Sequence, residues 1–190
     1  VFKEVDFGTN LLDGPYAQTG IGEVFKSVSQ SNGEQALAIS DFQQYPPSYG
    51  APAAFIATPI KIRGRLAGVL ILQMPITHID QILTSHQHWE QEGLGKTGDT
   101  YLVGSDGLLR SNVRKIIENK AQFLSDLAKI EIAPEQIAKI DRYQTTILQL
   151  PINAELLQNP QEMEGQLAIG ENYFGKPVMA TFTDLTFAQL

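Results

Sequence analysis

Residues 93–114 (GLGKTGDTYLVGSDGLLRSNVR) constrain the fold most strongly, because they carry a β-hairpin pattern within a glycine-rich frame. The aromatic and β-branched run 100–103 predicts one strand, and 108–111 predicts a returning strand. Between them, Ser105-Asp106-Gly107 predicts a tight turn with a residue at positive φ. The sequence therefore places an antiparallel strand pair in the second half of the chain.

The same stretch contains Gly95-Lys96-Thr97, which resembles the end of a phosphate-binding loop. Such a loop needs a glycine five positions before Gly95, where this chain has Glu90. It must also lead into a helix whose N-terminal amides hold the phosphates, whereas the next segment here reads as a strand. Nucleotide binding is therefore not expected.

Hydrophobic periodicity predicts the remaining elements. Helices are expected over 15–29, 76–92, 113–130, 134–141 and 154–161, and strands over 1–7, 36–42, 53–62, 66–74, 166–173 and 176–183, with 145–150 either a strand or an extended link. The near-continuous apolar runs 53–62 and 66–74, joined by a tight turn at Arg63-Gly64-Arg65, predict central strands covered on both faces. Because antiparallel hairpins dominate, the expected fold class is α+β.

Composition excludes several classes of protein. The chain has 190 residues, a formal net charge of −7 and no cysteine, so disulfides, thiolate metal sites and thiol catalysis are excluded. Acidic and basic residues are interspersed, so no basic stripe exists to bind nucleic acid. The longest apolar run, 66–74, is far shorter than the roughly 20 residues that span a bilayer.

The sequence offers weak candidates for catalysis and metal binding. On a helix over 76–92, His86 would share a face with Glu90, and His88 with Glu92, but two ligands per face do not complete a site. No G-x-S-x-G motif surrounds any serine. We therefore expect a solvated helix end, with Trp89 as a packing anchor, and neither enzymatic activity nor a metal or cofactor.

The strongest candidate for ligand binding is the proline-stiffened segment 41–55. Small-molecule pockets combine aromatic walls with a few aimed polar groups, and a stiff loop lowers the ordering cost of binding. The candidate residues are Asp41, Tyr45, Ser48, Tyr49 and Phe55. An alternative with equal standing is that the tyrosines only cap the core.

The pattern T-G-D-T-Y-L-V-G-S-D-G at 97–107, with Arg110-Ser111 in the returning strand, resembles the opening hairpin of the membrane-proximal module in double Cache (dCache) sensor domains. These domains are extracytoplasmic parts of bacterial transmembrane receptors. The likeness extends to 1–12, 41–60, 68–76 and 175–185, and so covers nearly the whole chain. The best-matching subgroup resembles the sensor regions of membrane-bound adenylate/guanylate cyclases and methyl-accepting chemoreceptors.

The resemblance implies two PAS-like (Cache) modules, each an antiparallel sheet with flanking helices, joined by a helix. Residues 1–92 would form the membrane-distal module with the connecting helix, and residues 93–190 the membrane-proximal module. In the family a helix and a strand precede the first segment, and one more strand follows the last. We therefore expect truncation at both ends.

In dCache domains the ligand usually lies in the distal module, where 41–55 corresponds to one pocket wall. Members that sense amino acids resemble one another in an aspartate, near the end of the strand aligned with 66–74, that pairs with the ligand ammonium. This chain has Gln73 there, which cannot form that charge-assisted contact. The resemblance therefore implies a neutral or anionic small molecule rather than an ordinary α-amino acid.

The expected function is an extracytoplasmic small-molecule sensor that signals to a cytoplasmic output such as a nucleotide cyclase, a chemoreceptor or a histidine kinase. The resemblance implies a periplasmic or extracellular location, attachment to the cell membrane through flanking segments, and a homodimer formed through the missing N-terminal helix. Two alternatives stay open. One is a dimerisation module that senses nothing, and the other is a hydrolase or metal enzyme in which His86 and His88 converge with a carboxylate.

Overall fold

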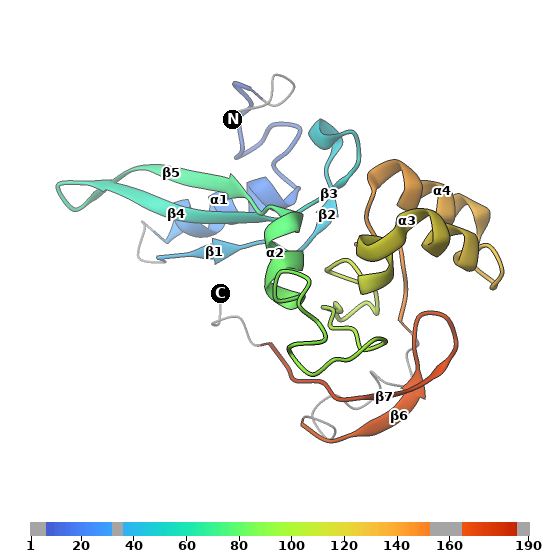
Figure 1. The fold of residues 1–190 in the computed structure, drawn as a ribbon. Coiled ribbons are helices and arrows are strands. Elements are labelled where there is room, and N and C mark those ends of the chain that lie inside the picture. Colours follow the sequence, from blue (N-terminus) through green and yellow to red (C-terminus); the bar gives the residue numbers. More distant parts are fainter. Residues whose placement is uncertain (1–6, 32–35, 153–164, 186–190) are drawn as a thin grey trace. The chain divides into compact units, whose positions relative to one another are not determined.

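The computed structural model describes residues 7–31, 36–152 and 165–185. It shows an α+β fold in which the strands pair antiparallel (Figure 1). The chain divides into two compact units, unit 1 up to Pro75 and unit 2 from Ile76, and each has its own hydrophobic core. Of the expected elements, the helix over 154–161 and all but Phe7 of the strand over 1–7 lie outside the described residues, and Phe7 itself is in a turn.

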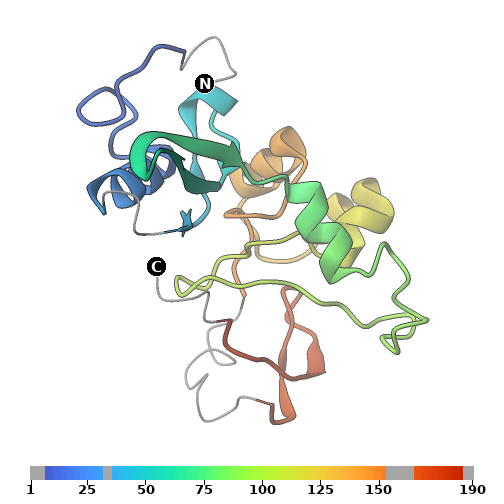
Figure 2. The same ribbon diagram turned by 90° about the vertical axis from the view of Figure 1, so that its left-hand side faces the viewer.

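Unit 1 is built on a three-stranded antiparallel sheet in the order β1-β4-β5, with helix α1 packed against it (Figures 1 and 2). The strands are β1 (Ala38–Ile39), β4 (Phe55–Ile62) and β5 (Arg65–Gln73), and the helix is α1 (Gly20–Gln30). Ile21, Val24 and Val28 of this helix are buried, and Phe25, which its spacing also places on the apolar face, is half-buried. The prediction that the helix begins at residue 15 is wrong.

The segment before α1 forms hydrogen-bonded turns instead of helix. Ala17 N–H donates to the carbonyl of Gly14, and Thr19 N–H to that of Tyr16. A side chain could not fit at Gly20, where an added Cβ would meet the Ser40 hydroxyl and the Phe55 ring. The first residue of α1 therefore lies close against the sheet.

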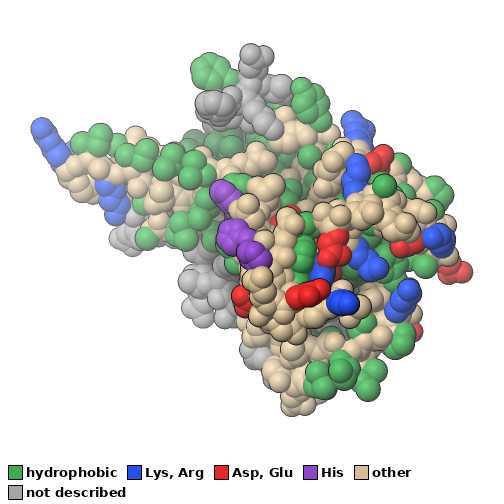
Figure 3. Space-filling view, viewed as in Figure 1, with side chains coloured by type: hydrophobic (Ala, Val, Ile, Leu, Met, Phe, Trp, Pro, Cys, Tyr) green, Lys and Arg blue, Asp and Glu red, His purple; other side chains and the backbone are tan. Residues whose placement is uncertain are grey.

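The β4–β5 hairpin has the predicted tight turn, in which Arg63 and Gly64 have φ of 52° and 77°. Two residues at positive φ match the right-handed twist of paired strands. The prediction that both faces are covered is wrong, because α1 covers one face and leaves the other exposed among the described residues. Figure 3 shows the exposed hydrophobic side chains along this hairpin, which are Ile60, Ile62, Leu70 and Leu72.

The strand expected over 36–42 is reduced to β1. The chain then turns into a second, two-stranded pairing of β2 (Gln43–Gln44) with β3 (Pro52–Ala53), which carries the one-turn helix η1 (Pro46–Ser48) at its tip. Asp41 lies between β1 and β2, where the chain leaves the first sheet for the second. Its carboxylate accepts a hydrogen bond from the Phe42 N–H at 2.7 Å. The proline-stiffened segment is therefore the tip of a small hairpin.

Unit 2 opens with α2 (Ile76–Leu83), so the prediction of a helix over 76–92 is wrong in its second half. Ser85, His86 and Gln87 all have positive φ, between 45° and 70°. The His86 N–H reaches back to the Gln81 carbonyl at 2.8 Å and closes the helix end. Such a left-handed helix end usually contains glycine, which is why this one is hidden in the sequence.

The hairpin over 100–111 is present, but its strands are reduced to an isolated bridge between Val103 and Leu109. The predicted turn is confirmed, with Gly107 at φ 78° and its N–H bonded to the Gly104 carbonyl. Two hydrogen bonds flank this bridge, from the Gly104 N–H to the Leu108 carbonyl and from the Arg110 N–H to the Leu102 carbonyl, and on its other edge the Leu109 N–H bonds to the Leu150 carbonyl. Thr145–Leu150, expected to be extended, forms hydrogen-bonded turns.

The rest of unit 2 consists of α3 (Arg114–Leu127), α4 (Pro134–Tyr143) and the predicted hairpin of β6 (Ala168–Glu171) with β7 (Pro177–Ala180). The expected helices over 113–130 and 134–141 are confirmed within a few residues of their predicted ends. The core joins all these parts and contains Leu109, Val113, Ile116, Phe123, Leu127, Ile140, Leu150, Ile152 and Tyr173.

Candidate functional site

The loop at the tip of the β2–β3 hairpin holds three of the predicted ligand residues in a closed hydrogen-bonded turn. Tyr45 N–H donates to the Ala51 carbonyl, and the Tyr45 carbonyl accepts from the N–H groups of Ser48 and Gly50, all within 3.1 Å. Pro46 and Pro47 fix φ inside this turn. The predicted stiffness of the loop therefore has a structural cause.

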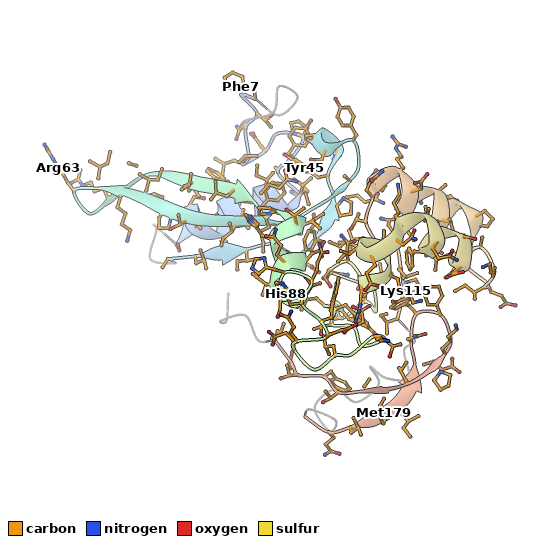
Figure 4. All side chains as sticks on the ribbon, in the orientation of Figure 1. Phe7, Tyr45, Arg63, His88, Lys115 and Met179 are labelled. Carbon is orange, nitrogen blue, oxygen red and sulfur yellow. The ribbon has the colours of Figure 1, made fainter. Side chains whose placement is uncertain are left out.

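Three predicted residues lie in the interior of unit 1. Tyr45, Ser48 and Phe55 are exposed by only 2%, 9% and 4%. The rings of Tyr45 and Phe55 meet edge to face at 5.0 Å, and Tyr16 lies 5.9 Å from Tyr45. Figure 4 shows Tyr45 within unit 1. In this structure the two aromatic rings fill the core, as the capping alternative expects.

The other three predicted residues are exposed. Phe55 pairs with Gln73 in the β4–β5 ladder, and the Ser40 N–H donates to the Phe55 carbonyl, which places Asp41 and Gln73 at the same end of the sheet. Tyr49 is 82% exposed, with φ of 58°. The structure thus brings Asp41 and Gln73 to one sheet end beside Phe55, and holds Tyr49 outward on the loop.

Unit 2 contains a hollow of about 190 Å³ that the sequence reasoning missed. It lies between α3, the chain that follows α3, and the turn joining β6 to β7. Its lining consists of Lys115, Asp126, Lys129, Ile130, Phe174 and Lys176. These residues form no local motif, because Lys115, Lys129 and Lys176 lie in separate parts of the sequence.

A buried polar cluster joins the N-terminus of α3 to the glycine-rich segment 93–98. Both oxygens of Asp99 accept the Arg114 N–H, at 2.9 and 3.0 Å, and one also accepts the Tyr173 hydroxyl at 3.2 Å. Burial raises the pKa of Asp99 to about 6, against these hydrogen bonds, which lower it. Burial, reinforced by the Asp99 charge, raises the pKa of Tyr101 to about 12 and that of Tyr173 further still.

The Arg114 side chain fastens that glycine-rich segment. Its guanidinium donates to the carbonyls of Gly95 and Gly98 at 2.9 and 3.0 Å, pairs with Glu118 at 2.6 Å, and lies 4.5 Å above the centre of the Trp89 ring. Trp89 is therefore a packing partner of a buried cation. The segment that resembled a phosphate loop has its carbonyl groups turned toward this arginine, which is opposite to the polarity that binds phosphate.

The hairpin turn is held by a second arginine. Arg110 is 9% exposed and bonds to the Leu108 carbonyl and to Asp106, each at 3.0 Å. Hydrogen bonding to Arg110 holds the pKa of Asp106 below its usual range. A side chain at Gly104 would collide with the Arg110 guanidinium. The aspartate of this turn serves to close it, since it also accepts the Leu108 N–H at 3.0 Å.

The histidine segment does not form a metal site among the described residues. Because α2 ends at Leu83, His86 and His88 do not share helix faces with Glu90 and Glu92 as expected. The His88 ring instead contacts the Ser85 carbonyl through Nδ1 at 2.9 Å. No group of three or more histidine, aspartate or glutamate side chains in the described parts is arranged to hold a metal ion.

Comparisons with protein families, with curated proteins and with solved structures found no match for this chain. The likeness to dCache domains therefore has no support beyond the residues quoted for it. Within the described ranges, no helix has the length and apolar character needed to cross a membrane.

Proposed function

We propose that this chain is an extracytoplasmic small-molecule sensor domain of a transmembrane receptor, with PAS-like modules and with a ligand site in unit 1 that draws on residues 41–55 and Gln73. The motif resemblance supplies the receptor context, including a nucleotide cyclase, chemoreceptor or kinase output. Binding would shift a two-state packing equilibrium, and a ligand can do so only through its difference in affinity for the two states.

The observation that carries this proposal is the state of Tyr49. Its ring is 82% exposed although the loop beneath it is tightly hydrogen-bonded, and its backbone lies at φ 58°, a region that costs a residue other than glycine free energy. Backbone conformations of this kind cluster at binding and active sites, where the surrounding structure maintains them. Asp41 and Gln73 supply polar groups at one end of the sheet in unit 1.

The amide of Gln73 favours a neutral or anionic molecule that offers it hydrogen-bond donors or acceptors. Gln73 is neutral and can both donate and accept, whereas a carboxylate would be needed to pair with an ammonium group. The apolar faces of Tyr49 would contact the body of the ligand.

A thermal-shift screen against organic acids, amino acids, amines and purines tests the proposal. A ligand at 100 times its dissociation constant adds about 2.7 kcal/mol, which raises the melting temperature by several degrees. We expect Tyr49→Ala and Gln73→Ala to abolish the shift of a hit. Phe7→Ala is the matched control, since Phe7 is also an exposed aromatic residue of unit 1, at 75%.

If a ligand still shifts the melting temperature of both variants, this location for the site is refuted. If no compound shifts the melting temperature of the folded protein, the sensor function is refuted.

The second candidate, a dimerisation module, is favoured by the exposed apolar side chains of the β4–β5 hairpin. Concentration-dependent association that Leu70→Lys abolishes, with no hit in the screen, would support that alternative.

A further inference from the structure

The hollow in unit 2 combines a fixed apolar floor with an excess of positive charge. Phe174 and Ile130 both line the hollow and pack against the hydrophobic core of the unit. The core therefore holds their side chains in place. The Phe174 ring meets the rings of Tyr173 and Phe123 at 4.9 and 5.8 Å. The Asn172 side chain also accepts the Phe174 N–H at 2.9 Å, which fixes the turn. This part of the hollow is therefore formed before anything binds.

The charges around the hollow are unbalanced. Three lysines face one carboxylate, and that carboxylate, Asp126, is already bonded to Lys129 at 2.8 Å and to Gln122 at 2.9 Å. Among the described residues, the ammonium groups of Lys115 and Lys176 form no ion pair. Lys115 lies 5.4 Å from the centre of the Phe174 ring and extends from α3 toward the β6–β7 hairpin (Figure 4). The ammonium groups of Lys115 and Lys176 can therefore bind an anion that lies against the Phe174 ring.

The size of the hollow limits what can enter. Its volume of about 190 Å³ is below the range of about 300–1,000 Å³ typical of pockets for drug-sized ligands and cofactors. It exceeds the roughly 150 Å³ of an apolar cavity that takes one benzene molecule. A single ring or short chain with one acidic group is therefore enough to fill the hollow.

We propose that the hollow lined by Lys115, Asp126, Lys129, Ile130, Phe174 and Lys176 is a binding site for a small organic anion with an apolar body, such as an aromatic or branched-chain carboxylate. The carboxylate contacts the ammonium groups of Lys115 and Lys176, and the body lies on Phe174 and Ile130. This site lies within unit 2 and does not depend on the site proposed in unit 1.

Isothermal titration calorimetry of the whole chain with benzoate tests this proposal. For a ligand of this size we expect saturable binding in the millimolar to micromolar range, weakened by added salt. Benzyl alcohol, which has the ring without the charge, and inorganic phosphate, which has charge without the ring, should each bind more weakly than benzoate.

Lys115→Gln and Lys176→Gln should each weaken benzoate binding about 5- to 10-fold, since each removes a charge-assisted contact from an exposed site. Lys96→Gln is the matched control, because Lys96 is an exposed lysine of unit 2 that does not line the hollow, and it should leave the affinity unchanged. Tyr49→Ala should also leave it unchanged, which separates this site from the one in unit 1.

Three results would overturn the proposal. They are an absence of saturable benzoate binding, an affinity insensitive to both lysine variants, and phosphate binding as tightly as benzoate. The last result would show an unspecific cluster of surface charge. Phe174→Leu, which keeps an apolar side chain in the turn, provides a further check, because the loss of the aromatic face should weaken benzoate more than phosphate.

Discussion

Asp99 shows how one buried carboxyl can set the response of unit 2 to pH. Its neighbours are the Arg114 backbone and side chain, the hydroxyl of Tyr173, and Tyr101, with Glu118 close to the same group of rings. Burial outweighs the hydrogen bonds that favour the anion, so the pKa rises from 3.8 to about 6. The folded chain therefore binds this proton more tightly than the unfolded chain does.

The sign of the pH dependence follows. Because the folded pKa is the higher one, the stabilisation from protonated Asp99 is complete below pH 3.8 and is lost as the pH rises through about 6. Asp99→Asn should remove this loss, so the variant gains stability relative to the parent between pH 4 and 7 by on the order of 2–3 kcal/mol. Urea unfolding monitored by the fluorescence of Trp89, the single tryptophan, measures the difference. Parallel pH profiles for the two proteins would refute the assignment.

At the scale of elements, α3 behaves as two helices in one. Asn119 has φ −156° and ψ 88°, which breaks the helix, and its side-chain oxygen accepts the Gln122 N–H at 3.0 Å. That contact is the one made by an N-cap residue. Asn119 therefore ends one helical segment and starts the next within α3.

Removing this internal cap should destabilise unit 2. We expect Asn119→Ala to lower the free energy of unfolding by about 1 kcal/mol, because the Gln122 N–H loses its partner. Asn119→Asp keeps the acceptor and should stay close to the parent. Urea denaturation of the three proteins, followed by far-UV circular dichroism, makes the comparison. An alanine variant as stable as the aspartate variant would show that the kink needs no cap.

Elements were predictable from the sequence where a local signal fixes them. The β4–β5 turn has Gly64, the β6–β7 turn has Gly175, and α4 begins at Pro134, each a residue suited to that position. The end of α2 was not predictable, because Ser85 and His86 adopt left-handed backbone without any glycine to mark it. Local hydrogen bonds close the helix there, from the His86 N–H to the Gln81 carbonyl and from the His88 N–H to the Thr84 carbonyl.

The binding residues were harder to predict than the elements. The polar and aromatic residues of 41–55 predicted a binding loop, but the sequence does not show which of them are buried. In the structure Tyr45 faces the core and Tyr49 faces solvent. The hollow in unit 2 combines Lys115 with Phe174, which lie far apart in sequence and meet only after α3 and the β6–β7 turn have packed. No periodicity or spacing in the sequence predicts that these two residues come together.

At the scale of the whole molecule, the two units have separate cores of different character. The core of unit 1 is small and lies between α1 and one face of a sheet, with Val28 fully buried. The core of unit 2 is larger and surrounds α3, with Val113 fully buried. Trp89 belongs to unit 2, so its fluorescence reports that unit alone.

A matched pair of core substitutions tests whether the units unfold independently. Val28→Ala and Val113→Ala each remove the same atoms from a fully buried site, at an expected cost of about 2 kcal/mol. If the units are independent, Val113→Ala lowers the urea midpoint seen by Trp89 fluorescence, and Val28→Ala leaves that midpoint unchanged while shifting part of the circular dichroism transition. Separate cores predict this result, because a substitution acts on the cooperative unit that contains it. If both substitutions instead move both signals equally, the chain unfolds as one cooperative unit, and ligand binding in either unit would stabilise the whole.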